Sequence, residues 1–401
     1  MELHDLVDLS PIAQLLLVGA VLATLALLPA WLRHRHAAPA VRLRAVGLVT
    51  LFLTFDLVLF GAFTRLTDSG LGCPDWPGCY GNASPAGAHA EIQQAQTSMP
   101  TGPVTHGKAW VEMVHRYLAT GVGVLITWTL VRSAWLRRRS RGGGGDPGTD
   151  AGLSPGWAAL CFIWVCLQGL FGALTVTMKL YPAIVTLHLA GGIGLLALLA
   201  VQRQRQRPAT AGTALPPGVR LGAWVVFALV IVQMLLGGWV STNYAVLACS
   251  DFPTCQGRWW PQADYANGFT LLRALSHQAD GQLLRFDALV AIHWAHRLGA
   301  AVVLLALALF SASLQRLGTR TAQRHARALA GLAAWQLATG LGNVLLGWPL
   351  AAAVAHTGGA AALVAVLAHL LAYRPARLAT VPVAGAPVLP PGPTAVAPAR
   401  S

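Results

Sequence analysis

Residues 61–81 read GAFTRLTDSGLGCPDWPGCYG, and residues 237–257 read GGWVSTNYAVLACSDFPTCQG. Both stretches pass from the apolar end of a predicted helix into a polar turn, and then into a C-x5-C motif with a proline inside it. Cys73 corresponds to Cys249 and Cys79 to Cys255, each with an offset of 176 residues. An internal duplication of this kind predicts a fold built from two similar units.

Two further motifs recur in the same order on the C-terminal side of each cysteine motif. The first is EMVHRY at 112–117, which matches HWAHRL at 293–298 and pairs His115 with His296. The second is LHLAGG at 187–192, which matches AHTGG at 355–359 and pairs His188 with His356. The duplication predicts two pseudo-symmetric four-helix bundles, an N-terminal one at 43–203 and a C-terminal one at 219–373.

Composition places these bundles in a membrane. Of the 401 residues, 55% are hydrophobic and 10% are charged, whereas a soluble domain carries about 25% charged residues. This excludes a soluble enzyme and a disordered chain. A membrane-spanning helix needs roughly 20 apolar residues. Nine segments qualify, at about 12–32, 43–64, 109–135, 156–178, 183–202, 219–241, 288–314, 325–346 and 350–373. The sequence thus predicts an all-α polytopic membrane protein.

Basic residues alternate between the connections, which gives the spans a direction. Twenty of the 28 lysines and arginines fall in one set of connections and the tail, and six fall in the opposite set. The positive-inside rule makes the arginine-rich side cytoplasmic. The N-terminus is then outside, the C-terminus is inside, and a bacterial plasma (inner) membrane is the expected location. Because the charge of +14 is spread over short clusters, nucleic acid is not an expected partner.

The repeat leaves two terminal segments unassigned. Residues 1–42 hold an extra N-terminal span with its cytoplasmic connection, and residues 374–401 form a proline- and alanine-rich tail expected to be flexible and cytoplasmic. The stretch RGGGGDPGTDAG at 141–152 is interpreted in the same way.

The four matched histidines are the strongest functional signal. Each lies about six to eight residues from the outer end of its predicted span, a depth near 10 Å. Ionisable groups inside a membrane are usually functional, and two histidines at one level of a helix bundle can hold a metal centre. A haem with two axial imidazoles suits this arrangement, which predicts one haem site per half. The structural alternative is that the histidines only bridge helices.

Neighbouring side chains suggest how each site is completed. Arg116 and Arg297 directly follow the first histidine of each half and are candidate partners of haem propionates. His293 lies one turn before His296, where a role beside the ligand is one interpretation.

Glu112 marks a difference between the halves, since His293 takes its place in the second. A carboxylate one turn from a ligand histidine is costly in a membrane, so we expect one half to perform chemistry while the other holds a redox cofactor. Glu112 is a candidate general base or stabiliser of positive charge. A structural ion pair with Arg116 or Lys108 is the alternative. Asp56 is expected to be a second buried carboxylate with a packing or hydrogen-bonding role.

The cysteines fall into two classes. Those of the C-x5-C motifs lie on the predicted outer, oxidising side and form either a local brace or a redox pair. Cys161 and Cys166 lie five residues apart on one helix, too far around it to bridge, and are interpreted as small core residues.

Together, these motifs resemble the heme A synthase family, and the resemblance covers residues 43–373. It implies that the chain is an oxidoreductase that converts the C8 methyl of haem O to the formyl of haem A. It further implies that His115 and His188 face the substrate haem with Glu112 as catalytic carboxylate, and that His296 and His356 ligate haem b. Disulfides Cys73–Cys79 and Cys249–Cys255 are implied as well. The extra first span departs from the family pattern.

The resemblance also implies pathway neighbours: a farnesyltransferase that produces haem O, and the assembly of cytochrome oxidase. Further expected partners are membrane lipid, an electron acceptor or donor of unknown identity, and a second copy of the chain. Three rival classes remain: a bis-histidine di-haem electron carrier, a disulfide–quinone oxidoreductase using the external cysteines, and a two-repeat transporter.

Overall fold

The computed structural model describes residues 10–140, 154–206 and 215–373. The stretch 141–152 and the tail 374–401, both predicted to be flexible, lie outside the described residues. Within the described residues all regular structure longer than an isolated bridge is α-helical. The all-α prediction is confirmed.

In the described ranges, nine helices are long and apolar enough to cross a membrane, and each coincides with a predicted span. They are α1 (Ser10–His34), α2 (Pro39–Leu66), α4 (His106–Arg139), α5 (Pro155–Thr177), α6 (Pro182–Arg205), α7 (Pro217–Thr242), α9 (Phe286–Arg316), α10 (Arg320–Leu345) and α11 (Leu350–Leu371). Two short helices, α3 (His89–Ser98) and α8 (Tyr265–Gly268), lie in the long connections. The sequence did not predict them because these connections carry no long hydrophobic period.

Local chemistry sets where the spans begin. Proline opens α2, α5, α6 and α7, since its missing N–H needs no partner in the first turn. The side chains of Thr105, Ser154 and Thr319 cap α4, α5 and α10 by accepting a backbone N–H. These caps and prolines fix the helix starts and hence the level of the residues that follow.

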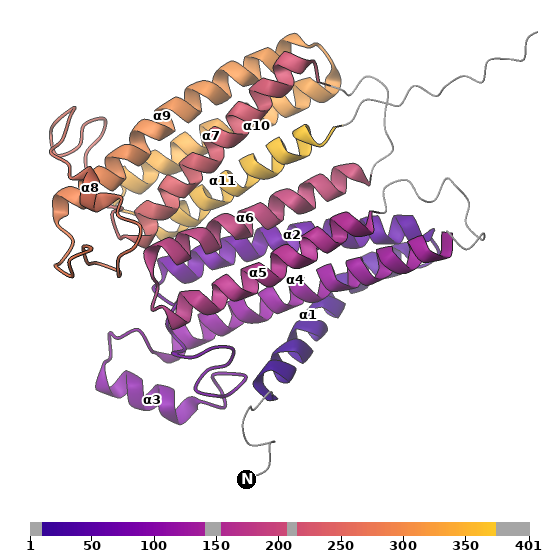
Figure 1. Cartoon of the computed structure of the whole chain (residues 1–401), viewed down its shortest axis with the longest axis horizontal. Helices are drawn as coiled ribbons and strands as arrows, with labels where there is room; N and C mark the ends of the chain where they lie inside the picture. The colour runs from indigo at the N-terminus through magenta and orange to yellow at the C-terminus, as the bar shows by residue number, and fades with distance from the viewer. Residues whose placement is uncertain (1–9, 141–153, 207–214, 374–401) are drawn as a thin grey trace, which may run out of the picture.

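The spans pack in two groups (Figure 1). Helices α2, α4, α5 and α6 contact one another in the lower group, and α7, α9, α10 and α11 do so in the upper one. Helix α1 lies outside the first group against α4 and α2, where Gly19 and Gly121 bring the two backbones close. The largest apolar core joins the groups through α2, α6, α7 and α11, with Val58, Ile193, Val226 and Val364 among its members.

Equivalent residues of the two repeats meet at the end of this junction that carries the long connections. Arg65 donates to the carbonyl of Ser241 at 2.7 Å, and the Tyr244 hydroxyl donates to Asp68 at 2.8 Å. The offset in both pairs is 176 residues, the same as for the cysteines. The contact therefore lies on the pseudo-twofold axis that relates the halves.

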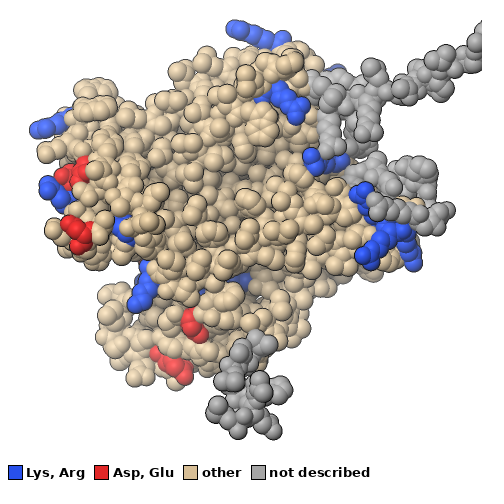
Figure 2. Space-filling model, viewed as in Figure 1, with Lys and Arg blue, Asp and Glu red and all other residues tan. Residues whose placement is uncertain are grey.

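Charged side chains separate the two ends of the bundle. On the face shown in Figure 2, Asp and Glu appear at the end that carries the α3 and α8 connections, together with Lys and Arg, while the opposite end shows Lys and Arg without acidic side chains. This distribution matches the sequence-based direction of the spans, which remains a prediction.

Candidate functional site

The four histidines lie on four helices near the end of the bundle that carries the long connections. His188 and His356 each follow the first residue of α6 and α11 by six residues, while His115 and His296 follow the start of α4 and α9 by nine and ten. At 1.5 Å per residue these depths are about 9–15 Å. Because α4 and α9 begin before their apolar runs, these distances from the helix starts exceed those from the predicted span ends, and the depth near 10 Å stays a prediction.

The histidines form one pair in each group of helices. The rings of His296 and His356 have centroids 6.5 Å apart with planes at 80°. Two imidazoles bound to one iron from opposite sides, through metal–nitrogen bonds of about 2 Å, have ring centres about 6 Å apart. His115 and His188, the equivalent residues of the first repeat, lie on α4 and α6 of the other group. The residues present thus fit a haem held by two axial imidazoles.

A glycine faces each of the four rings from the neighbouring helix. A Cβ at Gly61 would lie 3.0 Å from Cε1 of His115, and one at Gly237 would lie 3.0 Å from Cε1 of His296. Gly172 and Gly340 stand in the same relation to His188 and His356, at 3.4 and 3.3 Å. Gly61 and Gly237 are 176 residues apart and Gly172 and Gly340 are 168 apart, so the two repeats place a glycine against each ring in the same way.

Gly237→Ala should displace His296 and weaken any ligand bound by that ring. The added methyl cannot fit 3.0 Å from Cε1, so the imidazole must move by a few tenths of an ångström. Gly218 on the same helix meets no atom within 4 Å, and Gly218→Ala is the matched control. We expect reduced haem content of the purified protein for the first variant and unchanged content for the second. Equal haem content in both variants would contradict the inference that Gly237 leaves room for the His296 ring.

Both cysteine pairs form disulfides, at the end of the bundle that carries the α3 and α8 connections. The Cα atoms of Cys73 and Cys79 are 4.9 Å apart, and those of Cys249 and Cys255 are 4.8 Å apart. All four cysteines are fully buried. The pairing implied by the resemblance is present, and each bond closes a small loop against the first turns of α4 or α9.

The two disulfide loops share one internal architecture. The carboxylate of Asp75 accepts the N–H groups of Tyr80 and Gly81, and that of Asp251 accepts those of Gln256 and Gly257. The hydroxyl of Thr254 also donates to Asp251. Hydrogen bonds from Thr254 and from these backbone groups lower the pKa of Asp251 to about 2, so this loop keeps its anchor charged at any physiological pH.

Replacing both Cys249 and Cys255 with serine should cost about 2 kcal/mol, the chain-entropy value for a ring this small. The six-residue separation limits the effect, and the hydrogen bonds of Asp251 hold part of the loop without the disulfide. Thermal unfolding in detergent, with and without reductant, measures the loss. Wild-type and variant should unfold alike in reductant. A variant that cannot be folded at all would contradict a merely local brace.

Arg116 and Arg297 hold these loops. One Nη of Arg116 donates to the carbonyls of Asp75, Pro77 and Gly78. Arg297 donates to the carbonyls of Asp251 and Thr254 through one Nη and to that of Cys249 through the other. The proposed contact of these arginines with haem propionates stays a prediction. Their hydrogen bonds to the loop carbonyls are a finding that the sequence did not indicate.

Glu112 joins the same network. It is only 4% exposed, forms an ion pair with Arg116, and accepts the N–H of Cys73 at 2.8 Å. Of the two partners considered from the sequence, Lys108 instead donates to the carbonyl of Gly102. The ion pair is therefore real, and it places the carboxylate between a disulfide and a histidine, three residues before His115.

His293 occupies the equivalent place in the second half. It is 5% exposed, and its Nδ1 accepts the N–H of Cys249 at 3.2 Å. In both halves the side chain at this position accepts the N–H of the first cysteine of the disulfide loop, but only in the first half is that side chain a carboxylate.

Two other sequence-based expectations fail. Asp56 is exposed on α2 instead of buried, because its position on the helix turns it away from both groups. Cys161 is buried, as expected of a core residue, but Cys166 is exposed. The apolar surroundings on both sides of a membrane helix hide this difference from the sequence.

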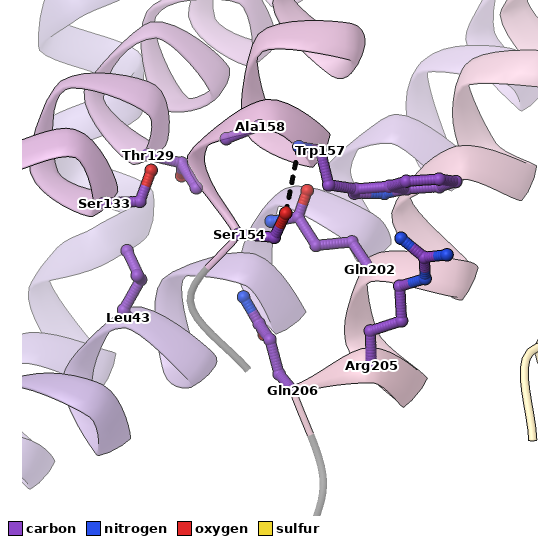
Figure 3. A pocket seen from close by; sticks show the side chains of 9 residues that line it. All are labelled: Leu43, Thr129, Ser133, Ser154, Trp157, Ala158, Gln202, Arg205 and Gln206. Carbon is purple, nitrogen blue, oxygen red and sulfur yellow. Dashed lines mark hydrogen bonds between the residues drawn. The ribbon is translucent and has the colours of Figure 1, made fainter. Parts of the chain in front are cut away.

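A small cavity lies at the far end of the first group (Figure 3). It has a volume of about 20 Å³, room for about one water. Helices α2, α4, α5 and α6 line it with Leu43, Thr129, Ser133, Ser154, Trp157, Ala158, Gln202, Arg205 and Gln206. Its lining holds none of the four histidines, so it is separate from the histidine site.

Comparison with known proteins gives a consistent result. Residues 44–368 match the family model COX15-CtaA, described as a cytochrome oxidase assembly protein. The chain is 37% identical over 330 residues to a protein of Shewanella oneidensis named heme A synthase, covering 80% of this chain and 92% of that protein. Proteins of the same name from Rhizorhabdus wittichii and Caulobacter vibrioides are 27% and 29% identical, covering 83% and 78% of this chain and 95% and 90% of theirs. With this match over residues 44–368 and a relative 37% identical over most of its length, the chain belongs to the heme A synthase family of cytochrome oxidase assembly proteins.

Proposed function

We propose that this protein converts haem O to haem A for the assembly of cytochrome oxidase. The observation that carries the proposal is the presence of two histidine pairs at one level with a buried carboxylate, Glu112, beside only one of them. The printed name of its relatives, heme A synthase, supports the product. In this proposal the first group of helices takes the substrate haem and the second holds haem b.

The reaction oxidises one methyl substituent of the substrate. Two successive two-electron oxidations take the methyl to an alcohol and then to a gem-diol, which loses water to give the formyl group. If water supplies the oxygen atom, the net change releases four protons and four electrons and the partner is an electron acceptor; if dioxygen supplies it, the partner is an electron donor. When bound, haem b supplies a one-electron redox centre near the substrate.

The chain's own residues would position the substrate haem and accept a proton from it. His115 and His188 fix the plane and level of the substrate ring, and Gly61 and Gly172 leave room for their imidazoles. Glu112 is held by Arg116 and the N–H of Cys73, so its carboxylate is oriented before the substrate arrives. A carboxylate fixed in this way can accept a proton from the reacting carbon or its hydroxyl.

The location follows from the same proposal. We place the protein in a bacterial plasma membrane, with its N-terminus and the histidine level on the outer side. Substrate would arrive from a farnesyltransferase that makes haem O, and product would leave towards cytochrome oxidase. Membrane lipid surrounds the spans, and a second copy of the chain is a further proposed partner.

The decisive experiment is expression together with a source of haem O, followed by extraction and chromatography of the haems. Haem A or hydroxylated haem O in the extract is the expected result. An extract that contains haem b and unchanged haem O would overturn the proposal and favour a di-haem electron carrier.

A further inference from the structure

The two histidine pairs differ in the surroundings of their Nδ1 atoms. A histidine that binds a metal through Nε2 carries its proton on Nδ1, and a hydrogen-bond acceptor for that proton fixes the tautomer and makes the ring a stronger ligand. The structure provides Nδ1 with side-chain partners in one half only.

Thr339 is the partner of His356. Its hydroxyl donates to the carbonyl of Trp335 at 2.7 Å, and its oxygen lies 2.9 Å from Nδ1 of His356. Because the hydroxyl proton is already used, the oxygen accepts from Nδ1–H. His356 is thereby held in the tautomer whose Nε2 lone pair is free for iron.

Gln233 is the partner of His296. Its amide Nε2 lies 2.9 Å from Nδ1 of His296 and donates to the carbonyl of the same residue. Its Oε1 is buried without a hydrogen bond. Gln233 thus positions the His296 ring by contacting both its Nδ1 and its backbone carbonyl, whereas Thr339 supplies the acceptor for an Nδ1–H.

The first half offers neither contact. Nδ1 of His115 and Nδ1 of His188 are buried without a hydrogen-bond partner within the described residues. The repeat explains this, since Leu57 stands at the position of Gln233 and Phe171 at that of Thr339. Neither side chain can accept a proton.

We propose that Gln233 and Thr339 are positioning residues that make the second half a permanent haem site, and that their absence from the first half lets its haem exchange. This inference rests on the proposed function for the statement that each half takes a haem. A substrate must enter and its product must leave, so weaker axial ligation suits the first pair. A resident cofactor must stay bound, so stronger axial ligation suits the second pair.

The test measures haem retention instead of conversion. Holoprotein purified with haem b is mixed with excess apomyoglobin, and the rate of haem transfer is followed by absorbance. Thr339→Val removes the acceptor with little change in volume and should raise the rate of loss from the second half by about 10–100-fold. It should also raise the midpoint potential, because a weaker imidazole donor favours the reduced iron.

Three further variants make the result specific. Thr339→Ser keeps the hydroxyl and should retain the wild-type rate. Thr127→Val is the matched control, since Thr127 also bonds back to the carbonyl four residues earlier but is exposed on α4, and it should change nothing. Phe171→Thr installs the missing acceptor and should slow haem loss from the first half by a similar factor.

Wild-type haem loss and an unchanged potential in Thr339→Val would overturn the inference. So would equal loss from Thr339→Val and Thr339→Ser, which would indicate a packing defect. Conversion of haem O is measured separately on the same preparations. If the wild type does not convert haem O while Thr339→Val still loses haem faster, the proposed function is contradicted and the role of Thr339 in haem retention is supported.

Discussion

Glu112→Gln should lower the conversion of haem O to haem A by about 100-fold or more, the usual contribution of a general acid or base, while haem content stays at the wild-type level. Glutamine has nearly the same shape and can still accept the N–H of Cys73 through its amide oxygen. It cannot take up a proton, and it loses the charge that faces Arg116. The amounts of haem O, hydroxylated haem O and haem A in extracts of equal protein measure the effect.

The internal repeat supplies the control for this variant. His293 makes the same contact with the second disulfide loop that Glu112 makes with the first. If Glu112 only holds its loop, then Glu112→Gln and His293→Gln should have similar, small effects on thermal stability and activity. A catalytic role predicts that only Glu112→Gln stops conversion. Full activity of purified Glu112→Gln would contradict that role.

Replacing one histidine of each pair, in two separate variants, should distinguish the functions of the two haem sites. His356→Ala is expected to lose the haem of the second half, because one axial ligand of the pair is gone and the remaining ring, His296, faces an empty position. The loss of haem affinity should exceed about 10–100-fold, the effect typical of replacing a residue that hydrogen-bonds to a metal ligand. Conversion should fall with it, because the redox centre that haem b would supply is then missing.

His188→Ala should have the complementary result. The second half should keep its haem b with an unchanged spectrum, while added haem O binds weakly and is not converted. Haem per chain and the absorption spectrum of the reduced protein distinguish the variants. Loss of the haem b spectrum in His188→Ala, or its retention in His356→Ala, would show that the halves are assigned the wrong way round.

Much of the arrangement could be predicted from sequence for a definite physical reason. A bilayer requires about 20 apolar residues per span and sorts arginine to one side, so the nine spans are visible as composition alone. The duplicated order of Cys73, His115 and His188 in one half and Cys249, His296 and His356 in the other then groups the histidines. The prediction that Asp56 is buried was wrong because hydropathy shows that a residue lies in a span but not which way its side chain faces.

The tertiary structure decided the contacts around those histidines. Arg116 and Arg297 hold disulfide loops, Glu112 meets Cys73, and Gln233 and Thr339 reach the Nδ1 atoms of one pair only. Each of these hydrogen bonds joins segments far apart in the chain and depends on the rotation and register of packed helices to within about an ångström. The sequence by itself determined which residues share a level of the bundle; only the packing decided which of them touch, and with that, how the two halves differ.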